Sequence, residues 1–237
     1  MATVGNMLRP LALTLTSLAL AGCSVLPGRS DSRDSRAERP TSPRTEARAP
    51  AISTSPAVRQ CLAGLGTTGA RFTPLPDQYR GEGCSTLGTV QLTALSGDYD
   101  QMVVSNLGPT TCDVTSAFAG WARYGVDRAA RQILGSPLKS IETYGSYSCR
   151  DVAGTGRRSA HATAAAIDIS GFTLADGRKI GVESHWNGGN AAEREFLRVV
   201  HASACKRFGT ILGPDYNAAH RNHFHVEGVV DGKSYCR

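Results

Sequence analysis

The stretch SAHATAAAID at residues 159–168 places His161 seven positions before Asp168, and this spacing decides how the chain must fold here. On one α-helix the two residues would lie roughly 10.5 Å apart along the axis, and on one straight strand more than ~20 Å apart. A zinc ion needs both ligand atoms about 2.0–2.2 Å away. We therefore expect a turn through residues 162–164 that folds His161 back, and a short buried strand at 165–170 that carries Asp168.

Three further histidines, His220, His223 and His225, follow about fifty residues later. On a strand, His223 and His225 point to the same face because they stand two positions apart. If both joined His161 and Asp168 around one zinc ion, the tetrahedral shell would be closed and the metal structural. With three protein ligands, a water takes the fourth place and the metal can catalyse hydrolysis. We favour the open site, in which a spare histidine moves protons.

Two other interpretations compete with a zinc site. Unrelated surface and core histidines are typical of an isolated His-x-His pair, but they explain the combined pattern poorly. A hydrolase triad of Ser159, His161 and Asp168 is also disfavoured, since the sequence around Ser159 lacks the Gly-x-Ser-x-Gly elbow that exposes a nucleophile.

At these residues the sequence resembles known families. Ser-x-His-(x)6-Asp followed by His-x-His is similar to the zinc peptidase superfamily of lysostaphin-type endopeptidases, D-alanyl-D-alanine metallopeptidases and the hedgehog signalling domain. The chain from Tyr147 onward, with GPDYNAAHRNHFH at 213–225 and the closing YCR, more closely resembles the bacterial extensin-like C-terminal domain family. This second resemblance covers nearly everything after about residue 58.

The resemblance implies roles for particular residues. His161, Asp168 and His225 would bind one Zn²⁺ ion, and His223 would act as the base or stabilise the transition state. Arg150 is similar to the arginine that precedes the first zinc histidine in D-alanyl-D-alanine peptidases, where it could clamp a substrate carboxylate. A surface arginine on a strand is the alternative for Arg150. The remaining candidates are His220 for the catalytic neighbourhood and Ser159, Asp215, Tyr216 and Asn217 for substrate contacts.

The chain also departs from these relatives. The superfamily often has glycine where this chain has Ala164, and extensin-like relatives often carry glutamate at the position of Ala160. The glutamate that acts as general base in some D-alanyl-D-alanine peptidases has no obvious counterpart, because Glu227 follows His225 instead of preceding it. The sequence therefore specifies the metal ligands more closely than the group that transfers protons.

The N-terminus predicts export. A mostly apolar segment at 11–20 follows Arg9 and is too short to span a bilayer, which is typical of a signal peptide. LAGC at residues 20–23 resembles the lipobox of bacterial lipoproteins, with ordinary secretory cleavage as the alternative. We expect residues 1–22 to be the signal peptide and Cys23 to carry lipid. Because Ser24 resembles outer-membrane sorting signals, we expect an anchor at the periplasmic face of the outer membrane.

The seven cysteines are consistent with export to the periplasm. Once Cys23 is reserved for lipid, an even number remains, and an oxidising periplasm permits disulfides among them. Sequence alone does not choose the pairing. The spacing excludes a C-x2–4-C zinc knuckle. We predict the pairs Cys61–Cys84, Cys112–Cys149 and Cys205–Cys236.

Composition divides the rest of the chain. Residues 23–57 are rich in Ser, Arg, Pro, Thr and Ala, so we expect a disordered linker that spans on the order of 30 Å. Residues 58–237 are expected to form one domain, with helices at 113–134 and, after a capping box of Asn190 and Glu193, up to Gly209. Expected strands lie at 90–95, 102–107, 141–149, 165–170, 179–182, 210–212 and 223–230.

This mixture predicts an α+β fold with a mainly antiparallel sheet and flanking helices. The resemblance implies a domain like those of hedgehog and D-alanyl-D-alanine peptidases. We expect a zinc-dependent peptidase that hydrolyses amide bonds of peptidoglycan peptides. The alternative is a non-catalytic wall-binding or structural lipoprotein that keeps zinc for stability. The net charge of +6 favours anionic envelope polymers, nothing resembles a nucleic-acid module, and no pattern specifies the oligomeric state.

Overall fold

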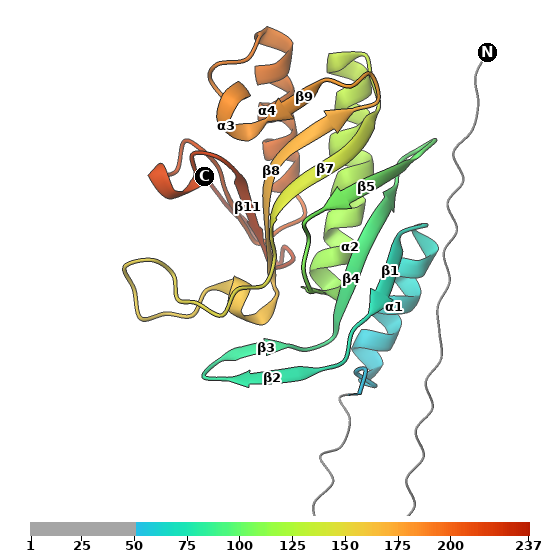
Figure 1. Cartoon of the computed structure of the whole chain (residues 1–237), viewed down its shortest axis with the longest axis vertical. Coiled ribbons are helices and arrows are strands. Elements are labelled where there is room, and N and C mark those ends of the chain that lie inside the picture. The colour runs from blue at the N-terminus through green and yellow to red at the C-terminus, as the bar shows by residue number, and fades with distance from the viewer. Residues whose placement is uncertain (1–50) are drawn as a thin grey trace, which may run out of the picture. The chain divides into compact units, whose positions relative to one another are not determined.

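Strand β8 (Ala166–Leu174) lies inside the main sheet of a computed structural model that describes residues 51–237 (Figure 1). Its buried residues Ile167, Ile169, Phe172 and Leu174 belong to the core, and an irregularity in the β7–β8 register between Ile169 and Gly171 allows both pairs to share this face. Phe172 packs against Trp121 and against Phe196, with ring centroids 6.2 and 5.3 Å apart. Asp168 belongs to the opposite face, because side chains alternate along a strand. The predicted strand at 165–170 is therefore present, and it continues to Leu174.

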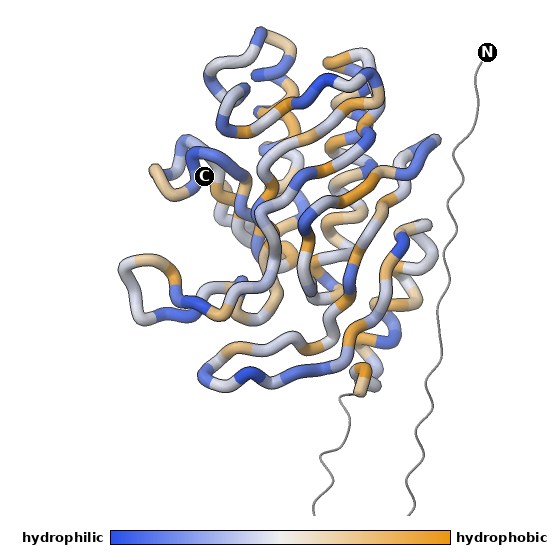
Figure 2. The backbone as a smooth tube through the Cα atoms, in the orientation of Figure 1, coloured by the Kyte–Doolittle hydropathy of each residue, from blue (hydrophilic) through white to orange (hydrophobic). Residues whose placement is uncertain are grey.

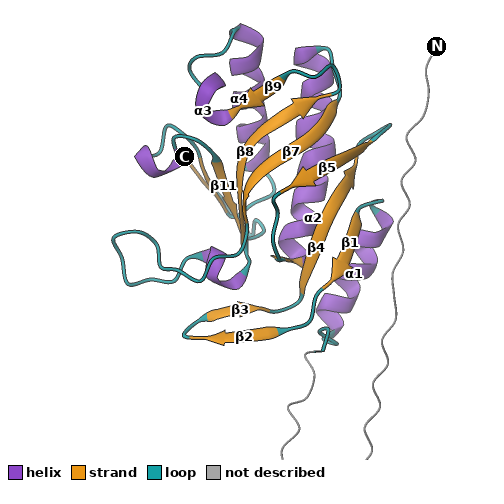
Figure 3. Cartoon of the chain, in the orientation of Figure 1, coloured by secondary structure: helices purple, strands orange, loops and turns teal. Residues whose placement is uncertain are grey.

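The described part of the chain contains both helices and strands, with six consecutive strands between α1 and α2 (Figure 3). The helical segments are α1 (Pro56–Thr67), α2 (Cys112–Trp121), η1 (Ala122–Asp127), η2 (Ala130–Leu134), η3 (Ala160–Thr163), α3 (Val182–His185), α4 (Ala191–Ala204) and η4 (Ala218–His220). The other strands are β1 (Arg71–Pro74), β2 (Gln78–Gly81), β3 (Cys84–Thr86), β4 (Thr89–Ser96), β5 (Gln101–Ser105), β6 (Thr110–Thr111), β7 (Leu138–Gly145), β9 (Lys179–Gly181), β10 (Thr210–Leu212), β11 (Phe224–Glu227) and β12 (Tyr235–Cys236).

The main sheet has the order β1-β4-β5-β7-β8-β11-β10-β12, with β6 beside β4 and β9 beside β8. The pairs β5–β7 and β10–β12 are parallel, and the other pairs are antiparallel. Strands β2 and β3 form a separate hairpin. Figure 2 shows apolar residues recurring along the central strands and the helices behind them. The predicted α+β fold with a mainly antiparallel sheet is confirmed.

Both predicted helices are present. The first runs from Cys112 through Leu134, with two π-helical segments, and ends where Gly135 adopts a left-handed conformation with φ 69°. Glycine takes this conformation without steric cost. The second is α4, whose capping box joins Asn190 and Glu193 as expected, but it ends at Ala204 instead of continuing to Gly209. The strand expected at 141–149 instead runs from Leu138 to Gly145, because the chain leaves the sheet before Cys149.

The six cysteines of this region form the pairs Cys61–Cys112, Cys84–Cys149 and Cys205–Cys236. The predicted Cys205–Cys236 pair is confirmed, whereas Cys61–Cys84 and Cys112–Cys149 are wrong. Helix α1, which we did not predict, packs against α2 and brings the Cα atoms of Cys61 and Cys112 to 6.1 Å. The β2–β3 hairpin places Cys84 beside the loop that contains Cys149, at 5.5 Å. Cys23, the predicted lipid site, lies outside the described residues.

Contacts with the domain begin slightly before residue 58. Ile52 forms a β-bridge with Pro76, and the Asp77 N–H donates to the Ala51 carbonyl. Ser55 caps α1 by accepting a hydrogen bond from the Val58 N–H. No helix between residues 51 and 237 is long and apolar enough to cross a membrane.

Candidate metal centre

A tight turn returns His161 to the sheet, as the spacing required. Ser159 begins η3 and its Oγ accepts a hydrogen bond from the His161 N–H. Ala164 ends the turn at φ 56°, a left-handed conformation that costs an alanine roughly 1–2 kcal/mol. Its N–H donates to the His161 carbonyl, and its carbonyl accepts from the Thr111 N–H. A glycine would adopt this turn more easily, yet the alanine is accommodated.

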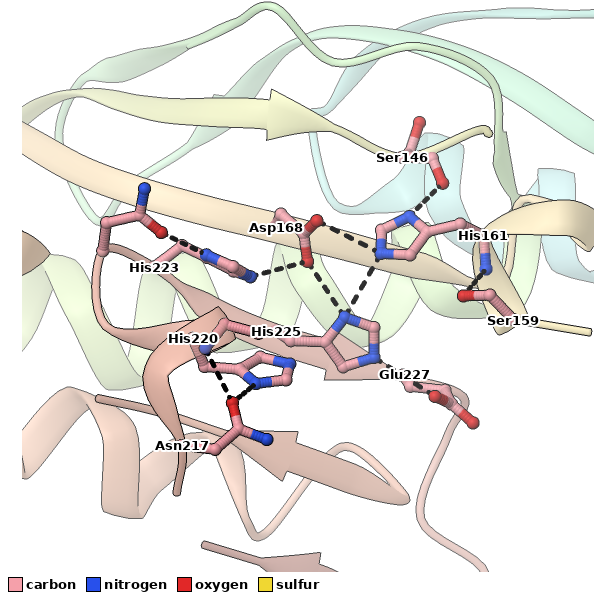
Figure 4. Close-up of polar contacts among 11 residues, drawn as sticks. Ser146, Ser159, His161, Asp168, Asn217, His220, His223, His225 and Glu227 are labelled. Carbon is pink, nitrogen blue, oxygen red and sulfur yellow. Dashed lines mark hydrogen bonds and ion pairs between the residues drawn. The ribbon is translucent and has the colours of Figure 1, made fainter. Parts of the chain in front are cut away.

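The turn and two neighbouring strands bring three potential ligands together (Figure 4). Asp168 and His225 are direct partners in the register of β8 and β11. His161 Nε2 lies 3.2 Å from Asp168 Oδ2 and 3.2 Å from His225 Nδ1. His225 Nδ1 lies 2.9 Å from Asp168 Oδ1. One ligand atom from each residue thus falls within 4.8 Å of the other two. We call these three residues the donor cluster.

Hydrogen bonds on the far side of each imidazole set its tautomer. His161 Nδ1–H donates to the Ser146 carbonyl over 2.6 Å, which leaves the Nε2 lone pair directed into the cluster. His225 Nε2–H donates to Glu227 Oε2 over 3.1 Å, which leaves its Nδ1 lone pair directed there. Metal-binding histidines in proteins almost always have such a carbonyl or carboxylate partner. The donor set therefore fits a metal ion that accepts two nitrogens and one carboxylate oxygen.

The electrostatics of the cluster call for a positive charge at its centre. Burial opposes ionisation of Asp168, but hydrogen bonds from His161 and His225, made when their facing ring nitrogens carry a proton, outweigh it and hold its pKa well below the usual range. Burial also opposes charging of the His225 ring, yet hydrogen bonds to Asp168 and Glu227 raise its pKa to about 9. Two imidazole lone pairs facing one another at 3.2 Å need a proton or a cation between them.

His223 stands beside the donor cluster. Its Nδ1–H donates to Asn222 Oδ1 over 2.8 Å, and its Nε2 lies 3.5 Å from Asp168 Oδ1. Burial lowers the pKa of His223; Asp168 opposes this effect, and positive charge on His225 adds to it. The ring is therefore neutral at pH 7, and its Nε2 can accept a proton.

His220 completes the histidine group from η4. Its Nδ1–H donates to Asn217 Oδ1 over 2.8 Å, and its ring centroid lies 5.2 Å from that of His223. Burial, followed by electrostatic interaction with His223 and His225, lowers the pKa of His220 to about 4. His220 is thus a second neutral imidazole close to the cluster, where the sequence suggested it.

A cavity of about 560 Å³ opens over the donor cluster. Among the residues in its wall are the predicted Arg150, Ser159, Tyr216, Asn217, His220 and His223. Arg157, which we did not predict, lines the same cavity. It is carried with Arg150 on a loop closed by hydrogen bonds from Ser159 N to the Arg150 carbonyl and from Val152 N to the Arg157 carbonyl. The disulfide Cys84–Cys149 ties this loop to the β2–β3 hairpin.

A family model described as the extensin-like protein C-terminus matches residues 59–237, which include every residue of the cluster and of the cavity wall. The chain belongs to this extensin-like family. No curated protein and no solved structure matches it.

One candidate in the extensin-like domain is placed elsewhere. Asp215, predicted to contact substrate, is absent from the cavity wall. Its Oδ1 accepts from Trp186 Nε1 over 2.7 Å and its Oδ2 pairs with Arg198 Nη1 over 2.8 Å. The indole hydrogen bond, and after it Arg198, lower the Asp215 pKa. Its carboxylate therefore joins the loop before η4 to α3 and α4.

Several contacts of the extensin-like site were beyond sequence reasoning. Glu227 lies two positions after His225, so its face was predictable, but the ring orientation that makes it a partner was not. Ser146 contributes a backbone carbonyl, which any residue type supplies. Arg157 and Arg158 are adjacent and chemically equal; only the structure shows that Arg158 turns to Asp151, 2.8 Å away, while Arg157 lines the cavity.

Proposed function

We propose that the extensin-like domain is a zinc-dependent peptidase that hydrolyses amide bonds in peptidoglycan peptides. The observation that carries this proposal is the donor cluster: His161 Nε2, Asp168 and His225 Nδ1 converge with their lone pairs directed at each other, and Asp168 and His225 line one cavity. Two imidazoles and one carboxylate are a ligand set typical of catalytic zinc sites. Bound there, zinc would polarise a carbonyl and make a water acidic near pH 7.

The residues beside the cluster are suited to moving a proton. His223 is held by Asn222 at Nδ1, so Nε2 is free to take a proton from the attacking water. The same atom can then donate that proton to the amine that leaves. His220, neutral and close by, can assist or replace it. This division keeps the three donors for the metal and a histidine for acid–base chemistry.

The cavity wall suits an anionic peptide. Arg150 and Arg157 place two guanidinium groups in the same wall, and guanidinium binds carboxylate in a bidentate manner. The peptides of peptidoglycan carry carboxylates. The net charge of +6 also attracts the protein to anionic envelope polymers.

The proposal also covers the cellular location of the protein and its membership of a larger superfamily. We place the protein in the cell envelope, anchored by lipid on Cys23 at the periplasmic face of the outer membrane, because LAGC at residues 20–23 resembles a lipobox and the domain pairs its cysteines. We also propose that its fold is that of the superfamily containing lysostaphin-type endopeptidases, D-alanyl-D-alanine metallopeptidases and the hedgehog domain. The shared motif supports this relationship.

The test uses full-length protein, zinc-loaded and metal-free, with purified sacculi and defined muropeptides. We expect new peptide products with zinc, none after chelation, and none from His225→Ala. Absence of zinc-dependent cleavage, or full activity in His225→Ala, would contradict the proposal. Tight zinc bound by His223 as well as the donor cluster, without turnover, would instead support the wall-binding alternative.

A further inference from the structure

A second cavity, of about 310 Å³, lies beside the donor cluster on the side of His223. Three of its wall residues connect it to the site. Asn222 accepts the hydrogen bond from His223, and the Tyr144 ring lies 5.9 Å from the His223 ring. Ser170 is two positions after Asp168 on β8 and shares its face. In Figure 4, His223 and His161 lie on opposite sides of Asp168. His223 lines the first cavity and donates its hydrogen bond to Asn222 of the second.

Glu142 contributes an oriented carboxylate to the wall of this second cavity. Its Oε1 accepts hydrogen bonds from Ser140 Oγ over 2.6 Å and Thr173 Oγ1 over 2.7 Å. These two donors fix the orientation of a half-buried group. A carboxylate has further acceptor positions, and Oε2 provides them here. Among residues 51–237, no arginine, lysine or histidine lies within 4.0 Å of the Glu142 carboxylate.

The other charged residues of this wall differ from Glu142. Glu183 pairs with Arg221, with 3.5 Å between Oε1 and Nε, and both side chains are exposed. Lys179 is exposed on β9. Each cavity thus offers a different group to a ligand: the first carries the guanidinium groups of Arg150 and Arg157, and the second carries the oriented Glu142 carboxylate.

The register of β7 and β8 gives the distance between Glu142 and the donor cluster. Glu142 pairs with Gly171, three residues along β8 from Asp168, which corresponds to about 10 Å of strand. An extended substrate covers that length with about three residues. A substrate that reacts at the cluster thus presents its third residue, or the end of a long side chain, to Glu142.

We propose that the second cavity is a substrate subsite in which Glu142 binds a primary ammonium group about 10 Å from the reacting amide. This inference rests on the proposed peptidase function. The substrate is then a peptide with a carboxylate near Arg150 in the first cavity and an ammonium group near Glu142 in the second. These two residues set the direction in which the peptide binds.

The experiment compares a free-amine muropeptide with the same peptide after N-acetylation, using zinc-loaded full-length protein. Acetylation should lower the wild-type kcat/KM at least about tenfold, because a charge-assisted hydrogen bond is lost. Glu142→Gln keeps an acceptor for Ser140 and Thr173 but loses the charge. It should turn over both peptides at the lower rate with unchanged zinc content. Glu183→Gln, the matched control in the same wall, should behave as wild type.

The same peptides keep the subsite testable if no turnover occurs. Their binding to chelator-treated protein, measured by NMR titration, should show the same preference for the free amine in wild type and Glu183→Gln. A Glu142→Gln variant that retains the full preference for the free amine, in turnover or in binding, overturns the subsite. Absence of turnover with the binding preference intact would contradict the peptidase function alone.

Discussion

Two groups of potential metal ligands occur between residues 51 and 237. They differ in whether their nitrogen and sulfur atoms are available to bind a metal ion. In the donor cluster, His161 and His225 are held from outside by Ser146 and Glu227, so that one nitrogen of each points inward. In the second group, Cys205 and Cys236 have joined in a disulfide, and His201 Nε2–H donates to the Arg237 carbonyl. Proximity of ligand-type side chains is therefore insufficient; the hydrogen bonds behind them decide whether a metal can bind.

The largest expected difference is between one histidine of each group. His161→Ala should weaken zinc binding more than about a hundredfold, exceeding the loss of an outer partner, whereas His201→Ala should leave one zinc per chain. Zinc content after dialysis against a competing chelator, with circular dichroism as a check of folding, measures both. Equal zinc loss in the two variants would remove the distinction.

Removing the disulfide of the second group should change stability and leave the metal in place. In Cys205→Ser/Cys236→Ser, a loop of 31 residues is opened, so the free energy of unfolding should fall by about 3 kcal/mol. Urea denaturation measures the fall, and the zinc content should stay at one per chain. A lower zinc content in the folded variant would mean that the two groups are coupled.

Glu227 tests the role of the outer hydrogen bonds. Glu227→Ala removes the acceptor from His225 Nε2 and should raise the Kd for zinc about 10–100-fold. Glu227→Gln retains an acceptor without charge, and its Kd should fall between those of Glu227→Ala and wild type. Competition with a chromophoric chelator gives the values, with Glu183→Gln as the control. Unchanged affinity in Glu227→Ala would mean that Glu227 does not position the ring.

The smallest effect on stability is expected from substituting Asp98, whose carboxylate pairs with two arginine side chains. Hydrogen bonds from Arg128 and Arg123, at 2.7 and 2.8 Å, lower its pKa to about 2, below its unfolded value. Its ionised form therefore stabilises the fold above about pH 4, and this contribution disappears as the pH falls through 2. Asp98→Asn should lower Tm by no more than about 4 °C at pH 6, with the difference vanishing near pH 2 and zinc unaffected. A Tm difference that persists at pH 2 would contradict the ion-pair explanation.

The sequence predicted the parts of the fold that obey a local rule. The separation of His161 and Asp168 required a turn, and the two-residue period put His223 and His225 on one face. Asn190 and Glu193 marked the start of α4. These features depend on neighbours in the chain, so a single sequence reveals them.

The parts that were missed depend on contacts distant in sequence. Helix α1 buries fully only Leu65 and carries a weak apolar pattern, and β2 is largely exposed. Choosing Cys112 as the partner of Cys61, and Cys149 as the partner of Cys84, required knowing what α1 and the β2–β3 hairpin pack against. The contact of Glu227 with His225 depends on a ring orientation, which residue identity does not encode.

The most direct test of the open three-ligand site is X-ray absorption of zinc-loaded wild type and His223→Ala. The donor cluster predicts two imidazole ligands in both proteins and one zinc per chain. Loss of one imidazole from the metal in His223→Ala, or loss of the zinc itself, would show a closed four-ligand site and contradict the proposal that His223 is kept for proton transfer.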